Sequence, residues 1–200
     1  MQDYVDVDMN QDMQAFADKL TIAGIPVEQV EYWGTEVKKV KTGKILQIDK
    51  HPDADKLVVC QVDMGDEQLQ IVTAATNVRV GQIVPVAVHG AHLPGGTKIK
   101  RSKLRGVLSN GMFCSAHEFG FDDSLLLPEE REGIWILPPD TPLGVDAADY
   151  LQVRDVVYEY ELTANRADCF SMVGLSREFA VLSGKEARYP EISVKECDTP

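Results

Sequence analysis

The stretch "KILQIDKHPDADKLVVCQVDMG", residues 44–65, contains two β-rich runs separated by a turn. The runs "KILQI" and "KLVVCQVDMG" carry the branched aliphatic side chains that favour strands. Between them, His51 precedes Pro52 and is therefore biased towards extended geometry, while Asp53 can close an Asx turn on its own backbone. The stretch thus predicts two strands of an all-β unit, connected by a shaped loop.

The same pattern continues on both sides of this stretch. From Val37 to Ser115 no long helical periodicity interrupts it, and turns rich in Gly, Pro, Asn and Asp separate the apolar runs. The further runs are "LQIVTAA" (69–75), "IVPVAV" (83–88), "GMFCS" (111–115) and "GIWIL" (133–137). Short strands at this spacing predict a small closed barrel or a sandwich. Between the last two runs, residues 116–132 are acidic and loop-like, with one short helix expected near residues 122–130.

The N-terminal flank has a different pattern. "YVDVD" (4–8) alternates as a strand does, and "VEQVEYW" (27–33) is expected to form a second strand. Between them, apolar residues recur at helical spacing from residue 13 to residue 23. Asn10 is expected to cap this helix and Gly24 to end it in the left-handed conformation.

The C-terminal flank repeats that pattern. "VVYEYEL" (156–162) alternates, and a helix follows, with Asp168 as its expected N-cap and Gly184 at its end. Each flank is too small to bury a core alone, so pairing them would make one α+β domain. We therefore predict an α+β fold in which a discontinuous domain is interrupted by an inserted barrel. The predicted boundaries are residues 1–37 plus 153–192 for the outer domain, 38–152 for the barrel and 193–200 for a tail or the start of a linker.

Charge is segregated along the chain. The net charge of −12 is composed of −7 over residues 1–37, +6 over residues 38–109 and −11 over residues 110–200. Five cations fall within residues 98–105 with no acid among them: Lys98, Lys100, Arg101, Lys103 and Arg105. Such a segment indicates an anionic partner, although the cations could instead neutralise the acidic regions of the same protein.

Enzyme and metal signatures are absent from the sequence. It has no GxGxxG, GxxxxGK[ST], HExxH or GxSxG motif, and its four cysteines, Cys197 among them, lie far apart. We therefore expect no catalytic residue, no metal site and reduced thiols, as in a cytoplasmic protein. A catalytic group formed by His51 with Asp53 and Asp55 is a weaker alternative to the shaped loop. No membrane span and no signal peptide are expected either.

The basic segment suits phosphate. Lysine offers a mobile point charge and arginine a planar fork, and both bind phosphate oxygens. Ser109 and Asn110 follow as hydrogen-bonding groups, and Gly111 permits close backbone approach. Aromatic side chains for base stacking are sparse here, which argues against a generic single-strand binder. Nucleic-acid binding through backbone phosphates is thus the leading hypothesis.

The stretch 44–65, together with "KIKRSKLRGVLSNGMFCS" (98–115), resembles the tRNA-binding OB-fold domain. The flanks resemble the split N-terminal domain of the bacterial phenylalanyl-tRNA synthetase β chain, into which that OB domain is inserted. The family pattern KI(K/R)xxKxRGxxSxGM is matched by Lys98, Ile99, Lys100, Lys103, Arg105, Gly106, Ser109, Gly111 and Met112. Asn77 matches the asparagine of the family's GAxN loop, and Ala74 stands where glycine is common.

The resemblance implies a function. A synthetase of this family joins phenylalanine to its tRNA with ATP and Mg²⁺, as an (αβ)₂ assembly of α and β chains in the cytoplasm. Its catalytic and editing sites lie elsewhere, so this fragment is expected to be non-catalytic and to hold no cofactor itself. The expected RNA-binding residues are Lys98, Lys100, Arg101, Lys103, Arg105, Asn77, Ser109 and Asn110. The alternative is an assembly module that contacts other synthetase domains and has little direct contact with RNA.

Overall fold

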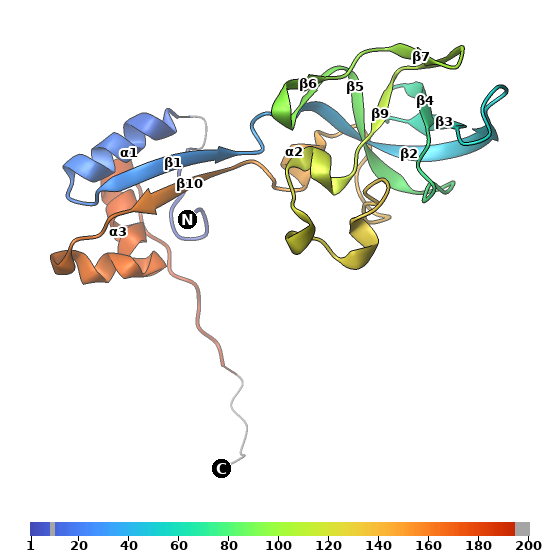
Figure 1. Cartoon of the computed structure of the whole chain (residues 1–200). Helices are drawn as coiled ribbons and strands as arrows, with labels where there is room; N and C mark the ends of the chain where they lie inside the picture. The colour runs from blue at the N-terminus through green and yellow to red at the C-terminus, as the bar shows by residue number, and fades with distance from the viewer. Residues whose placement is uncertain (9–10, 195–200) are drawn as a thin grey trace. The chain divides into compact units, whose positions relative to one another are not determined.

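A computed structural model describes residues 1–8 and 11–194 of the chain (Figure 1). The chain divides into two compact units, one formed by residues 1–31 with 156–200 and the other by residues 32–155. Both contain helices and strands. Within the described residues, no helix has the length and apolarity to span a bilayer.

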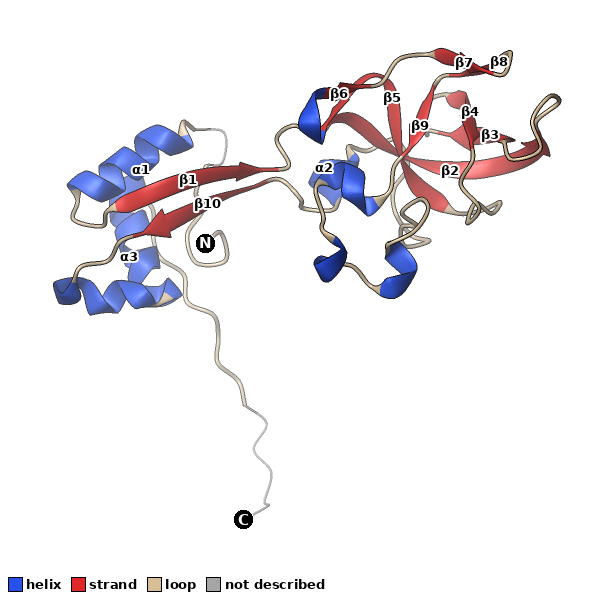
Figure 2. Ribbon diagram, viewed as in Figure 1, coloured by secondary structure: helices blue, strands red, loops and turns tan. Residues whose placement is uncertain are grey.

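The central unit, residues 32–155, contains a curled antiparallel sheet (Figure 2). Its strands follow the order β4-β3-β2-β5-β6, and β9 also pairs with β5. Their bounds are β2 Lys38–Lys50, β3 Val58–Asp63, β4 Gln68–Thr73, β5 Ile83–Leu93, β6 Thr97–Lys98 and β9 Gly111–Phe113. The opening stretch of the sequence thus supplies the second half of β2, the connecting loop and all of β3.

Strand β2 makes the sheet curl. Its first half pairs with β5 and its second half with β3, and the pairings meet at Lys44. Register shifts interrupt the strand between Lys38 and Val40 and again between Ile45 and Gln47, and Lys39 has a φ of +57° at the first of them. Because a bulge bends its strand and increases the local twist, two bulges let one strand serve both sides of a curved sheet.

The inner face of the curled sheet forms the main core of the central unit. Its buried residues are Ile45, Cys60, Val62, Met64, Leu69, Ile71, Val78, Val84, Val86, Phe113 and Ile134. Gly43 lies against this core, where a Cβ atom would come within 2.7 Å of the Met64 sulfur and 2.8 Å of Val62. The strands predicted for the runs at residues 56–65 and 69–75 are confirmed as β3 and β4, and both contribute buried residues to this core.

The segment after β9 differs from the prediction. "GIWIL" (133–137) is not a strand, and only Leu137 forms an isolated bridge, to Ile83. The Trp135 ring instead packs edge-on against Phe119 and Phe121, with centroids 5.4 and 5.5 Å away. The acidic segment before it forms three short 3₁₀ turns, Ala116–Phe119, Asp123–Leu125 and Pro128–Glu130, and the unit also contains a short helix, α2, Ala147–Tyr150. Aromatic packing explains why an apolar run that resembles a strand is not used as one.

The outer unit buries its own core between two helices and a two-stranded sheet. Its elements are α1 Met13–Ile22, β1 Val27–Trp33, β10 Asp155–Tyr160 and α3 Met172–Ser183, with β1 paired to β10. The Phe16 and Phe179 rings, one from each helix, lie with centroids 5.1 Å apart. The two chain segments thus share one core, although more than a hundred residues separate them in sequence.

Three local predictions for the outer unit are wrong or lie outside the described residues. Residues 4–8 form a turn and irregular structure instead of a strand. Asp12 caps α1 by accepting from the Ala15 N–H, and Asn10 lies outside the described residues. Ser171 rather than Asp168 caps α3, since Asp168 belongs to a preceding 3₁₀ segment, Ala164–Phe170. The two predicted helix ends are confirmed, because Gly24 and Gly184 have φ values of +91° and +66°.

Replacing Ser171 with alanine should destabilise the outer unit by about 1 kcal/mol, because the Gly174 N–H loses its side-chain acceptor at 3.0 Å. Urea unfolding followed by circular dichroism measures this loss. Ser171→Asp is the matched control, since aspartate also caps helices well, and it should retain most of the stability. Equal losses in both variants would contradict a capping role.

Candidate nucleic-acid interface

The basic segment forms an exposed hairpin and its approach. Lys98 ends β6, Lys100 and Arg101 lie in the connection, and Lys103 lies in β7, Ser102–Leu104. Strand β8, Val107–Ser109, returns antiparallel, with Leu104 opposite Val107. The two turn residues, Arg105 and Gly106, have φ values of +46° and +90°, as a tight hairpin turn requires. The hairpin is a separate two-stranded sheet at the edge of the curled sheet (Figure 2).

All five cations of the basic segment, Lys98, Lys100, Arg101, Lys103 and Arg105, are exposed. Across residues 1–8 and 11–194, none of the five forms an ion pair; the bases that do are Lys41, His117, Arg154 and Arg166. The alternative in which this segment neutralises acids of the same chain therefore has no support in the described part of the chain. The segment is a concentration of positive charge open to an external anion.

Strand alternation sorts the side chains of the hairpin. Lys103 and Leu108 are cross-strand partners on one face, whereas Ser102 and Ser109 are partners on the other. Ser109 is buried but Ser102 is exposed, so this face is turned towards the protein only at the base of the hairpin, whereas Lys103 and Leu108 are both exposed on the opposite face. The half-exposed Leu108 side chain thus lies beside a cation on the outward face.

Ser109 and Asn110 anchor the base of the hairpin. The Ser109 hydroxyl accepts from the Val72 N–H at 3.0 Å and donates to the Gly111 carbonyl at 2.8 Å. The Asn110 N–H donates to the Gln70 carbonyl at 2.9 Å. Ser109 therefore lies behind the candidate surface, and its visible role is to join β8 to β4.

Asn77 also makes its contacts within the protein. Its side-chain amide donates to the Ile134 carbonyl at 2.9 Å and its oxygen accepts from the Ile134 N–H at 3.0 Å. Gly133 lies directly against this amide, since a Cβ there would come within 2.3 Å of the Asn77 oxygen. The Asn77 side chain thus bonds the backbone N–H and carbonyl of Ile134, as a neighbouring strand would. RNA binding by Asn77 remains a prediction.

His51, which the sequence offers as a catalytic candidate, is buried and bonded to main chain. Its Nε2 lies 3.0 Å from the Leu104 carbonyl oxygen, and its Nδ1 accepts from the Asp53 N–H at 3.1 Å. Both ring nitrogens therefore form hydrogen bonds with main-chain groups. Asp53 bonds the ring through its backbone N–H and not through its carboxylate. The shaped-loop interpretation agrees with this geometry, but the ring rather than an Asx turn shapes the loop.

A cluster of metal-ligand types occurs in the outer unit. Among the described residues, Asp168, Cys169 and Glu178 present ligand atoms within 4.8 Å of one another. The Arg166 guanidinium lies among them and donates to Glu178 at 2.6 Å, to Asp168 at 3.3 Å and to the Cys169 sulfur at 3.1 Å. These hydrogen bonds to Asp168 and Glu178 raise the pKa of Arg166, and the same pairing lowers the pKa of Asp168. The donor set fits an ion-pair network centred on arginine.

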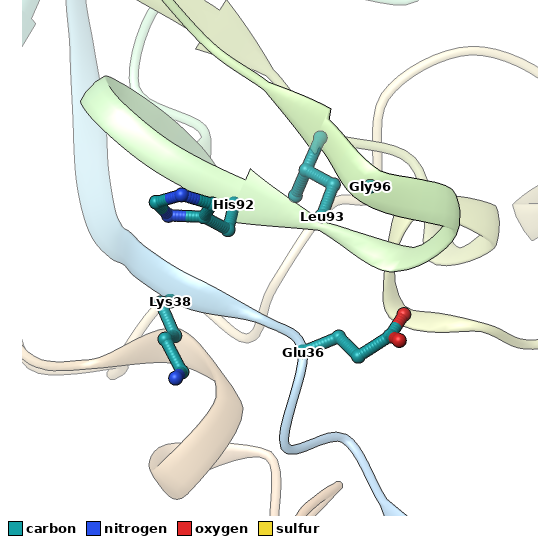
Figure 3. Close-up of a pocket in the computed structure, with 5 residues that line it drawn as sticks. All are labelled: Glu36, Lys38, His92, Leu93 and Gly96. Atoms are coloured by element: carbon teal, nitrogen blue, oxygen red, sulfur yellow. The ribbon is translucent and has the colours of Figure 1, made fainter.

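A shallow cavity of about 260 Å³ lies near the start of β2. It is lined by Glu36, Lys38, His92, Leu93 and Gly96 (Figure 3). In Figure 3 the Glu36 carboxylate and the Lys38 amine point in different directions, so these two charged groups do not converge on a common point. The cavity therefore lacks the converging polar groups that characterise a small-molecule site.

Two buried thiols should resist modification. Burial raises the pKa of Cys60 to about 11 and that of Cys114 to about 12. Because the thiolate is the reactive form, neither should react with a disulfide reagent at pH 8 in the folded protein, and both should react after addition of urea. Mass spectrometry of labelled peptides checks this expectation, and rapid labelling of either peptide in the native protein would contradict it.

Comparison with known proteins adds a family assignment for the central unit. Residues 40–146 match the family model described as "Putative tRNA binding domain". Among solved structures, the MetRS-related protein from Pyrococcus horikoshii aligns with 52% of this chain and 84% of its own, at 22% identity and a TM-score of 0.38, too low to support an inference.

Curated relatives match nearly the whole chain. The phenylalanine–tRNA ligase beta subunit of Moorella thermoacetica is 53% identical over 190 residues, which are 95% of this chain and 23% of the relative. Those of Syntrophus aciditrophicus and Clostridium acetobutylicum are 45% and 46% identical over 98% of this chain. The chain therefore spans about a quarter of the length of these relatives (23–24%).

Proposed function

Because this chain belongs to the tRNA-binding domain family through residues 40–146, we propose that the basic hairpin of its central unit binds tRNA through backbone phosphates. The observation that carries the proposal is the set of five exposed cations that no described acid pairs with. Contacts from mobile lysines and forked arginines neutralise phosphates and release counterions, which favours binding to a polyanion of any sequence. Binding at this hairpin is therefore directed at the RNA backbone rather than at base edges.

The wider proposal concerns the protein in which this chain acts. The matches support its being the N-terminal region of a phenylalanine–tRNA ligase beta subunit. The holoenzyme would attach phenylalanine to tRNA(Phe) in the cytoplasm, with an α chain as partner in an (αβ)₂ assembly. ATP and Mg²⁺ would act in other parts of that assembly, and this chain would be an accessory, non-catalytic region.

The domain proposal is an OB-fold barrel, residues 38–152, inserted into a discontinuous domain of residues 1–37 plus 153–192. The two ends of the central unit lie together, which supports it. Arg154 donates to the Val37 carbonyl at 2.7 Å, and a Cβ on Gly34 would come within 2.4 Å of the Val153 carbonyl oxygen. A unit whose ends meet can be inserted into another domain without spreading the host segments apart.

A second candidate function is assembly with other synthetase domains. Phe170 and Val181 are apolar side chains of the outer unit with 76% and 77% of their surface exposed. Isolated exposed apolar residues are common on proteins, so this observation is weaker than the unpaired basic segment. On this candidate the outer unit contacts protein while the hairpin has little contact with RNA.

Salt titration of tRNA binding tests the main proposal. If four or five cations of the hairpin meet phosphates, the plot of log Kobs against log salt concentration should have a slope of about −4, since each duplex phosphate contributes about −0.9. Fluorescence anisotropy with labelled tRNA(Phe) transcript between 50 and 300 mM KCl measures it. A slope near zero, or no binding at the lowest salt, would contradict phosphate-directed binding.

A further inference from the structure

His51 bridges two parts of the central unit that are far apart in sequence. It begins the loop between β2 and β3, whereas its hydrogen-bond partner Leu104 ends β7, immediately before the turn of the basic hairpin. His51 is only 6% exposed, so its ring is not part of the exposed surface that the cations form. A buried polar ring in such a place fixes the position of the strand that it contacts.

The protonation of the ring is set by its two partners. The Nδ1 atom accepts from the Asp53 N–H, so in this arrangement it carries no proton. The proton of the neutral ring is then on Nε2, which donates to the Leu104 carbonyl. One ring thus couples the shape of the loop to the position of the hairpin.

The hairpin needs such support. A two-stranded hairpin is marginally stable by itself, and β7 and β8 form a sheet separate from the main one. Strand β8 is fastened to β4 at its base, through the Ser109 hydroxyl and through Gln70, which donates to the Leu108 carbonyl at 2.6 Å. On the β7 side, the side-chain hydrogen bonds among the described residues come from two rings: His51, and His89, which accepts from the Arg101 N–H at 3.2 Å.

We propose that His51 is a positioning residue for RNA binding, which holds Lys103 and Arg105 where phosphates can reach them. This inference rests on the proposed function. The ring touches no RNA itself. It acts through the Leu104 carbonyl, which lies between the two cations in sequence, and so determines whether their charges act together.

Two substitutions separate the two bonds of the ring. In His51→Gln the longer amide carries an N–H near the Nε2 position and should still donate to Leu104. In His51→Asn the shorter side chain can accept from the Asp53 N–H near the Nδ1 position but cannot reach Leu104. His51→Ala removes both bonds. His117→Ala is the matched control, because both ring nitrogens of His117 also bond main chain of this unit, in this case the carbonyls of Phe121 and Arg131.

Hydrogen exchange of the amides in residues 102–109 is measured first, on the whole 200-residue chain without RNA. We expect exchange to accelerate about fivefold in His51→Asn and His51→Ala, since a lost hydrogen bond of about 1 kcal/mol corresponds to that factor. His51→Gln should restore at least half of the protection, and His117→Ala should leave these amides unchanged. Equal exchange in the asparagine and glutamine variants would overturn the proposal.

Binding of tRNA(Phe) transcript by the same variants is measured second. His51→Asn should bind about fivefold more weakly and lose about one to two units of salt slope, while His51→Gln stays within twofold of the unmodified chain. The positioning role would be overturned if tRNA binding weakened while hydrogen exchange of the hairpin amides stayed unchanged. It would also be overturned if that exchange accelerated while tRNA binding stayed unchanged. If the unmodified chain binds no tRNA, the proposed function fails, and exchange alone still decides whether His51 holds the hairpin. His51→Asn keeps the loop bond, so the test remains decisive if His51→Ala unfolds.

Discussion

A variant that carries Lys98→Glu, Lys100→Glu, Lys103→Glu and Arg105→Glu should bind tRNA at least about 100-fold more weakly at 150 mM KCl, with a salt slope near zero. Four phosphate contacts are lost, and four carboxylates then repel the same backbone. The positions are exposed and form no ion pair with a described acid, so the reversal should cost the fold little. Fluorescence anisotropy across the salt series measures the loss of tRNA binding. Circular dichroism of the variant and of the unmodified chain checks that the fold is retained.

The control for this variant reverses the same amount of charge elsewhere. Its four positions are exposed lysines outside the basic segment, without an ion pair among the described residues: Lys19, Lys44, Lys56 and Lys185. This control should keep most of the affinity and most of the salt slope. Equal weakening in both variants would mean that net charge, rather than the hairpin, governs binding. Unchanged affinity in the hairpin variant, together with altered assembly, would favour the second candidate function.

Gly111→Ala should destabilise the central unit by about 2–3 kcal/mol, at the upper end of what overpacking costs. A Cβ at this position would come within 2.3 Å of the Ala87 carbonyl oxygen, and backbone cannot give way as a flexible side chain can. Strand β9 must then move off β5, which breaks the pairing of Gly111 with Val88 and strains the Ser109 hydroxyl bond to the Gly111 carbonyl. Because that bond anchors the hairpin, tRNA affinity should fall as well. Urea unfolding of the whole chain gives the stability loss.

Gly81→Ala separates steric conflict from backbone strain. Gly81 has a φ of +92° and open space around its Cβ position, so its substitution tests the strain of a left-handed residue alone. We expect a loss of about 1 kcal/mol there, with tRNA affinity unchanged. If Gly111→Ala were no worse than this control, the close approach of β9 to β5 would not limit stability.

Three residues of the candidate site make contacts in the structure that their residue types alone do not predict. Gly111 was expected to permit close backbone approach, and it does, but the backbone that approaches is Ala87 of the same protein. Ser109 is a predicted RNA-binding residue; it is buried and accepts from the Val72 N–H, and its contact with RNA stays a prediction. His51 is predicted to belong to a shaped loop, with catalysis as the weaker alternative, and its Nε2 lies 3.0 Å from the Leu104 carbonyl oxygen of the hairpin. In each case the observed partner is main chain of the same protein, which the residue type alone does not predict.

What the sequence determined by itself was local. Short β-rich runs between turn residues predicted β1 and most of the curled sheet, alternation predicted β10, and helical spacing predicted both helices of the outer unit. These patterns reflect local backbone preference and which side of an element is buried. The cationic segment was evident from composition, and its exposure followed from the cost of burying unpaired charge.

Only the tertiary structure decided how distant segments meet. His51 and Leu104 are 53 residues apart, and Asn77 and Ile134 are 57 apart, yet each pair shares hydrogen bonds. Residues 4–8 and 133–137 have the pattern of strands and are not strands, because no neighbouring strand pairs fully with them and side-chain packing takes its place. The physical reason is that the spacing of apolar residues indicates only which side of a helix or strand is buried. The hydrogen-bond partner of a polar group depends on how β2 curls and on which loops this curl brings together.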